Sequence, residues 1–188
     1  REIWERKQNT AVEEIYASNA SLILKVKADL PDFDGNIVAR NTIEYSFFAS
    51  GQIEVKNQVH ITRKSKEEMP RFGMNLIIPG AYNQMTWYGR GPHESYWDRK
   101  TSAFVDVHSG SVADQYWPYI RPQENGNKTD VRWMKLLNEE GKGIIFKGIS
   151  LLSVSAHHNL IEDFESLERT DGRHKKGMKP VNRHTTDI

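Results

Sequence analysis

Hydrophobic and polar residues alternate along the first third of the chain with a period of two. The pattern is clearest in residues 22–28, where Leu, Leu, Val and Ala occupy every second position, and it recurs in 43–49 and 53–61. This period places neighbouring side chains on opposite faces of a strand, one facing a core and the other water. Turn residues separate the segments: a Pro/Asp/Gly loop at 31–36 and Ser-Gly at 50–51. The alternation predicts antiparallel β-structure.

Shorter strands and a single helix are predicted in the rest of the chain. Asn159 is a suitable N-cap for the helix, and Leu160, Phe164 and Leu167 follow at helical spacing. Many short strands with at most one short helix are typical of a large all-β sandwich, whereas alternating strands and helices would indicate a parallel sheet. The other predicted strands cover residues 74–78, 85–88, 103–107, 131–137, 143–147 and 151–155.

Composition and charge exclude several classes of protein. The 188 residues include 26 Lys or Arg and 25 Asp or Glu, a formal charge of +1, so we expect no general binding to nucleic acid or to an anionic membrane. No apolar run approaches the roughly 20 residues that cross a bilayer. The absence of cysteine excludes disulfides, thiolate nucleophiles and Cys-based zinc sites, and it leaves the compartment open between cytoplasm and periplasm.

The two ends of the chain differ in character from its middle. Residues 1–5 carry neither an initiator Met nor a basic-then-apolar signal, so we expect a piece of a longer protein. Residues 1–188 are expected to form one β-sandwich domain, truncated at its C-terminal end. Segment 169–183 holds six basic residues against one acid, which is typical of a solvated, flexible loop. Docking of an acidic partner surface is the alternative for that segment.

Aromatic residues concentrate in the middle of the chain. Nine of the 19 Phe, Trp and Tyr residues lie within 87–133, and Gly89, Gly91 and Pro92 predict a sharp loop directly after strand 85–88. Aromatic rings beside Arg, Glu, Gln and Asn suit a sugar site, because a pyranose packs its apolar face on a ring while amides and carboxylates bind its hydroxyls. The same residues also close the end of a sandwich through Arg–carboxylate pairs, which composition alone favours.

Two motifs carry a resemblance to a known family. Residues 87–99 read Trp-Tyr-Gly-Arg-Gly-Pro-x-Glu-x-Tyr-x-Asp-Arg, and 116–127 read Tyr-x-Pro-Tyr-Ile-x-Pro-Gln-Glu-Asn-Gly-Asn. With Met-Pro-Arg-Phe-Gly at 69–73, Arg-Trp at 132–133 and Ser-Val-Ser-Ala at 153–156, the chain resembles the C-terminal domain of family 2 β-galactosidases. The resemblance implies a large twisted antiparallel β-sandwich similar to galactose mutarotase, placed after a catalytic (β/α)₈ barrel.

The resemblance also implies where the chemistry lies. The family removes terminal β-D-galactose from β-galactosides with retention, which needs two carboxyls about 5 Å apart, and both glutamates lie in the barrel. No catalytic residue, metal site or cofactor is therefore expected in this chain, since the family holds its Mg and Na ions in other domains. A substrate-stacking tryptophan of the family is expected beyond Ile188. The implied partners are the other domains of the same enzyme, itself a homo-oligomer, with galactosides as candidate ligands.

The motif residues divide into two predicted groups. The acids are expected in ion pairs with arginine rather than in catalysis, and the candidate stacking platforms are the two loop tryptophans. For two of the polar residues, Gln123 and Asn125, capping of their own turns is the favoured alternative to sugar binding. The predicted ion-pair network is Arg90, Glu94, Asp98 and Arg132. The candidate substrate-binding residues are Trp97, Arg99, Trp117, Gln123, Glu124 and Asn125.

Three functions compete at this point. The first is a non-catalytic domain of a β-galactosidase, which shapes the substrate cleft and supports oligomer contacts. The second is a carbohydrate-binding module with its own galactoside groove. The third is an aldose 1-epimerase, for which His93 with Glu94 or Glu124 would supply the general acid and base. The adjacent histidines His157 and His158 are a poor chelating pair for a metal, because neighbours on a strand point to opposite faces.

Overall fold

The structure is a computed structural model, which divides the chain into two compact units, Arg1–Phe72 and Gly73–Ile188. The predicted all-β antiparallel class is confirmed, because every sheet among the described residues is antiparallel. A single domain over 1–188, and a likeness to galactose mutarotase, stay predictions. The structure describes residues 9–32, 34–62, 71–119, 123–160, 163, 169–170, 173–174 and 185–188.

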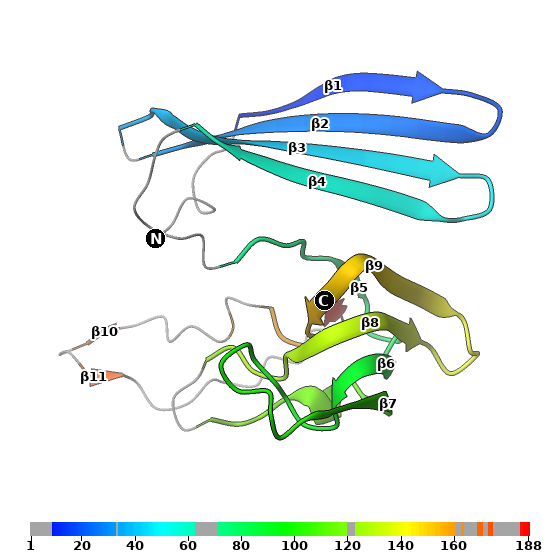
Figure 1. Cartoon of the computed structure of the whole chain (residues 1–188), viewed down its shortest axis with the longest axis vertical. Helices are drawn as coiled ribbons and strands as arrows, with labels where there is room; N and C mark the ends of the chain where they lie inside the picture. Colours follow the sequence, from blue (N-terminus) through cyan, green and yellow to red (C-terminus); the bar gives the residue numbers. More distant parts are fainter. Residues whose placement is uncertain are drawn as a thin grey trace. The chain divides into compact units, whose positions relative to one another are not determined.

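The first unit is one four-stranded sheet in the order β1-β2-β3-β4 (Figure 1). Both predicted turns are confirmed. Gly51 takes a positive φ of 84° between β3 and β4, and the Asp32 Oδ1 atom accepts the amides of Asp34 and Asn36 at 3.0 and 2.9 Å between β2 and β3. The strands are β1 Asn9–Ala17, β2 Ser21–Pro31, β3 Ile37–Phe48 and β4 Ile53–Ile61.

The strand register gives this sheet an apolar face and a polar face. Leu24 lies opposite Tyr45, which lies opposite Val55, so apolar residues line up across three strands. On the other face Lys56 Nζ donates to Glu44 Oε1 at 3.2 Å. The alternation read from the sequence is therefore the pattern of a sheet with one apolar and one polar face.

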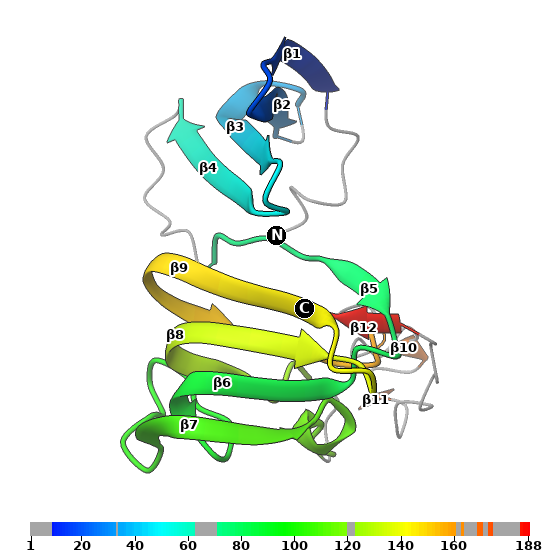
Figure 2. The same ribbon diagram turned by 90° about the vertical axis from the view of Figure 1, so that its right-hand side faces the viewer.

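The second unit is built on a four-stranded sheet in the order β7-β6-β8-β9 (Figure 2). Two further strand pairs, β12-β5 and β10-β11, complete its described strands, and a short 3₁₀ helix, η2 Ala113–Gln115, follows β7. The sheet strands are β6 Gln84–Gly91, β7 Phe104–Ser111, β8 Lys128–Leu137 and β9 Gly143–Val154. The short strands are β5 Ile77–Pro79, β10 Arg169–Thr170, β11 Arg173–His174 and β12 Thr185–Asp187.

A small apolar core holds this second sheet together. Trp87 is its largest member, and the indole Nε1 of that residue donates to the Arg90 carbonyl at 3.0 Å, so its one polar atom is satisfied. Burial of such side chains is the main stabilising contribution, at about 25 cal/mol per Å² of apolar surface. The buried cluster comprises Ile78, Met85, Trp87, Val112, Val131, Met134, Leu136 and Ala156.

Most of the predicted strands lie within observed ones, with two differences. The segments predicted at 143–147 and 151–155 form one continuous strand, β9, and 74–78 overlaps β5 only at its end. The predicted helix at 159–167 falls mainly outside the described residues. So does most of the basic segment 169–183, in which β10 and β11 pair Arg169 with His174. No helix in the described part of the chain is long and apolar enough to cross a membrane.

Gly89 lies inside strand β6, which corrects the prediction of a loop directly after Tyr88. The strand continues to Gly91 and the chain turns only at Pro92. A Cβ atom on Gly89 would lie 2.7 Å from Val131 Cγ2 and 2.8 Å from Val131 Cα, so glycine is what allows β8 to approach β6 this closely. Gly89 therefore indicates a close approach of the β6 and β8 backbones and not the start of a loop.

Gly89→Ala is therefore expected to destabilise the second unit by about 3 kcal/mol, because the new methyl group meets strand backbone that cannot move aside. Urea unfolding followed by tryptophan fluorescence measures the change. Gly73→Ala is the matched control, since a Cβ there meets no described atom within 4 Å, and it should shift the free energy of unfolding by less than about 0.5 kcal/mol. Equal effects of the two variants would contradict the close-approach explanation.

Candidate functional site

The two motif loops meet at the carboxylate of Glu94. Arg99 Nη2 donates to Glu94 Oε1 at 2.6 Å, and the amide of Gly126 donates to Oε2 at 2.8 Å. The Tyr119 hydroxyl also donates to Glu94 Oε1, and it accepts an N–H from Arg99 at 3.1 Å. The loop after β6 and the loop before β8 are thus joined through one side chain, and the structure brings the predicted residues Glu94 and Arg99 together.

This bonding decides the charge of Glu94. Burial opposes ionisation of the carboxyl, but hydrogen bonds from Tyr119, the Gly126 amide and Arg99 together outweigh burial and hold the pKa of Glu94 below its ordinary value. The carboxylate is therefore ionised at neutral pH, with both oxygens engaged. A group in this state is a structural anion and a poor proton donor.

Hydrogen bonds to the backbone fix the two loops further. The buried hydroxyl of Ser95 accepts the Thr129 amide at 3.0 Å, and Asn127 Nδ2 donates to the Ser95 carbonyl at 2.8 Å. Asn125 Oδ1 accepts the Trp117 amide at 2.9 Å, while Asn125 Nδ2 donates to the Gln123 carbonyl at 3.1 Å. Asn125 therefore caps its own loop, the alternative that the sequence favours.

A second anion, Asp130, holds the other end of the first loop. Arg90 Nε donates to Asp130 Oδ2 at 2.5 Å, and Lys100 Nζ donates to Oδ1 at 3.2 Å. The hydrogen bond from Arg90 is the main reason that the pKa of Asp130 lies below its ordinary value. Arg132 donates to the Asp130 carbonyl at 2.6 Å. Sequence reasoning did not single out Asp130, because nothing in its local spacing identifies Arg90 as its partner.

A pocket of about 390 Å³ opens beside Glu94. Trp117, 60% exposed, is one of its walls, and the side chain of Lys128, which sequence reasoning missed, reaches it from the start of β8. Its lining includes His93, Glu94, Arg99, Trp117, Tyr119 and Lys128. Aromatic walls with a few convergent polar groups are the ordinary composition of a small-molecule site.

The other candidate residues are not among the described residues that line this pocket. Trp97 is 70% exposed and stacks with Lys100, whose Nζ is 4.1 Å from the ring centroid. Gln123 and Asp98 are exposed, and Glu124 is half-buried. Of the six predicted substrate-binding residues, Arg99 and Trp117 therefore line the pocket, and Trp97, Gln123, Glu124 and Asn125 are not among the described residues that do.

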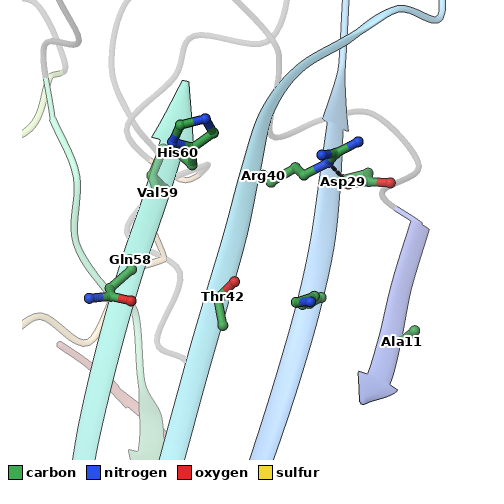
Figure 3. A pocket seen from close by; sticks show the side chains of 8 residues that line it. Ala11, Asp29, Arg40, Thr42, Gln58, Val59 and His60 are labelled. Carbon is green, nitrogen blue, oxygen red and sulfur yellow. Dashed lines mark ion pairs between the residues drawn. The ribbon is translucent and has the colours of Figure 1, made fainter. Parts of the chain in front are cut away.

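A larger hollow of about 770 Å³ lies on the polar face of the first unit. Its side chains come from β1 to β4, and Arg40 Nε lies 3.3 Å from Asp29 Oδ1 across it (Figure 3). The described residues that line it include Thr42, Gln58 and His60 but no Phe, Tyr or Trp. Because a sugar or another flat ligand needs a stacking surface, the pocket beside Glu94 is the stronger candidate site.

The histidines do not converge on a metal position within the described chain. His157 Nε2 donates to the Asn125 carbonyl at 2.8 Å, whereas His158 Nδ1 lies 3.0 Å from the Thr185 carbonyl. Burial lowers the pKa of His157 and favours its neutral form. His93 Nε2 lies 3.0 Å from Ser102 Oγ. No group of three or more His, Asp or Glu side chains in the described residues could hold a metal ion.

Arg99→Ala should lower the free energy of unfolding by about 1–2 kcal/mol, because it leaves the half-buried Glu94 carboxylate without its cation. Lys142→Ala is the matched control: its ion pair with Glu140, at 2.8 Å, is exposed on both sides, and its loss should change stability by less than about 0.5 kcal/mol. Chemical denaturation measures both variants. An unchanged unfolding midpoint for Arg99→Ala would count against the proposed role of this pair.

The lowered pKa of Glu94 also makes the free energy of unfolding depend on pH. Because its folded pKa is lowered, its contribution is present above the unfolded pKa of about 4.3 and is lost as the pH falls through the folded value. Glu94→Gln should therefore be less stable than the parent at pH 7 and lose less stability between pH 5 and 3. Unfolding in urea across this range tests it, with the exposed Glu139→Gln as control. Parallel curves for parent and Glu94→Gln would refute the assignment.

The sequence of the chain is similar to those of known proteins. A β-galactosidase of Priestia megaterium is 41% identical over 121 residues, which is 64% of this chain and 12% of the relative. Those of Halalkalibacterium halodurans and Vibrio cholerae are 34% and 35% identical over 54% and 53% of this chain, and 10% of each relative. The chain thus spans about a tenth of the length of these relatives. Because its residues 1–187 match the family described as β-galactosidase small chain, the chain belongs to that family.

Proposed function

We propose that this chain is a non-catalytic domain of a family 2 β-galactosidase, which removes terminal β-D-galactose from β-galactosides with retention. Its catalytic glutamates would lie in a barrel outside this chain, together with the Mg and Na ions of the enzyme. The names of the relatives and the small fraction of their length that matches support this assignment. The partners of the chain would be the other domains of the same, homo-oligomeric enzyme.

The engagement of Glu94 and Asp130 in ion pairs carries the proposal. A retaining glycosidase needs one carboxyl with a raised pKa as general acid and a second about 5 Å away as nucleophile. Glu94 and Asp130 both have lowered pKa values and are held by arginine and lysine. The epimerase alternative pairs His93 with Glu94 or Glu124. Both oxygens of Glu94 already accept hydrogen bonds, so the pairing with Glu94 gains no support.

Exposed apolar side chains on β9 support a role in a larger assembly. Ile145, Ile149 and Leu151 of that strand are all exposed. A cluster of such residues on one strand is typical of a surface that packs against another domain. The role would then be to present the two motif loops to the rest of the enzyme.

A galactoside-binding module is the second candidate, and one observation favours it. Trp117 is exposed, and it lines the same pocket as Arg99. The two side chains thus place a stacking surface and a hydrogen-bond donor in one pocket. Titration with galactose and lactose, followed by tryptophan fluorescence, distinguishes the two candidates. A saturable change that is lost in Trp117→Ala would favour the module, and no change in folded protein would favour the structural domain.

The chain alone is expected to hydrolyse no aryl β-galactoside, because Glu94 and Asp130 are both held as anions by their partners and are poor proton donors. In the complete enzyme, Glu94→Gln should lower the unfolding midpoint while leaving kcat/KM of the folded enzyme within about threefold, far less than the 10⁴-fold or greater losses on removal of a catalytic group. Release of p-nitrophenol from its β-galactoside measures hydrolysis by the chain and by the complete enzyme, and chemical denaturation measures the unfolding midpoint. Turnover by the purified chain that disappears in Glu94→Gln would overturn the proposal.

A further inference from the structure

Lys128 is a buried cation at the edge of the pocket. It is the first residue of β8, and only 2% of its surface is exposed. The Trp87 ring lies beside this side chain, with its centroid 5.2 Å from Lys128 Nζ. Among the described residues the ammonium has no hydrogen-bond acceptor and no carboxylate within ion-pair distance. Its side chain lines the pocket beside Glu94.

The surroundings of Lys128 leave its charge uncompensated. Glu94 is the one carboxylate that acts on it, and the oxygens of Glu94 already accept hydrogen bonds from Arg99, Tyr119 and Gly126. Burial lowers the pKa of Lys128 to about 8, so the side chain is still largely an ammonium at neutral pH. The rest of the residue is buried, and its ammonium would be more favourable with an acceptor than without one, so an acceptor that enters the pocket would stabilise it.

We propose that this pocket binds a carboxylate, with Lys128 Nζ as its counter-ion. The ammonium offers three N–H groups and none is used within the described structure, whereas Glu94 and Asp114, the two carboxylates in the described lining of the pocket, already accept hydrogen bonds. Gln115 Nε2 donates to the Ser111 carbonyl at 2.9 Å, and Asp114 Oδ2 accepts the Ser111 amide at 3.0 Å. The surplus of donors selects a ligand that accepts hydrogen bonds and carries a negative charge.

The size and walls of the pocket indicate what could carry the carboxylate. About 390 Å³ leaves room for a six-membered ring beside the charged group, and Trp117 offers that ring a surface. A sugar acid meets both requirements. An Asp or Glu side chain from another domain of the enzyme proposed above would present the same carboxylate to Lys128, and the two sources separate experimentally.

The first experiment titrates the chain with galacturonate and galactose, which differ only in the C6 carboxylate, and follows the fluorescence of the tryptophans beside the pocket. Galacturonate should bind, galactose should bind at least roughly tenfold more weakly, and Lys128→Met should abolish the difference, whereas Lys128→Arg should keep it. Lys135→Met, on the same strand and outside the pocket lining, should behave as the parent. Equal binding of both sugars, unchanged in Lys128→Met, would overturn the proposal.

The second experiment separates a ligand site from a structural lysine. If Lys128 is unpaired in the chain, Lys128→Met should leave the unfolding midpoint unchanged or raise it, because Met fills the same volume without a charge to desolvate. A lower midpoint in the chain alone would overturn the proposal.

The complete β-galactosidase tests the other source of the carboxylate, and this arm alone depends on the proposed function. If a side chain of another domain fills the pocket, galacturonate will not bind the chain, and Lys128→Met will lower the midpoint of the complete enzyme but not that of the chain. If galacturonate does not bind and Lys128→Met changes neither midpoint, no carboxylate is recognised there and the proposal fails.

Discussion

The carboxylate of Glu94 is the interaction on which the rest of the candidate site depends. Its side chain is only 13% exposed, so its lone pairs must be satisfied from within the protein. They are satisfied by groups from both motif loops, Arg99 on one side and Tyr119 with the Gly126 amide on the other. Neither loop can move without breaking a charge-assisted bond. Glu94 therefore couples the described parts of the two loops that line the pocket.

Charge, rather than an apolar core, closes the loop between β6 and β7. At one end Arg90 binds Asp130 and also donates to the Ala103 carbonyl at 2.7 Å, and near the other Arg99 binds Glu94. Both carboxyls have lowered pKa values, so acid weakens the two contacts together. The backbone contributes to the same contact. Gly89 allows β8 to lie close to β6, which places Asp130 beside Arg90.

Local pattern predicted the sheet better than it predicted the site. β2, β3 and β4 were identified because each keeps one apolar face in register. β1 was not delimited, because a bulge between Val12 and Glu14 interrupts its period of two. The motifs located the pocket and the pair of Glu94 with Arg99, five residues apart. Asp130 was missed because its partner, Arg90, is 40 residues away, a contact that only the fold creates.

Lys128 differs from the other cations around the two motif loops, because it has no carboxylate partner among the described residues. Arg90, Arg99 and Lys100 are more exposed than Lys128, yet each has a carboxylate partner. Stability alone would favour an apolar side chain beside the Trp87 ring at that position, because it fills the space without desolvating a charge. A ligand that binds only the folded chain restores the lost stability in proportion to its affinity and concentration. An unpaired buried cation at a pocket is therefore better explained by what the pocket binds than by what holds the chain folded.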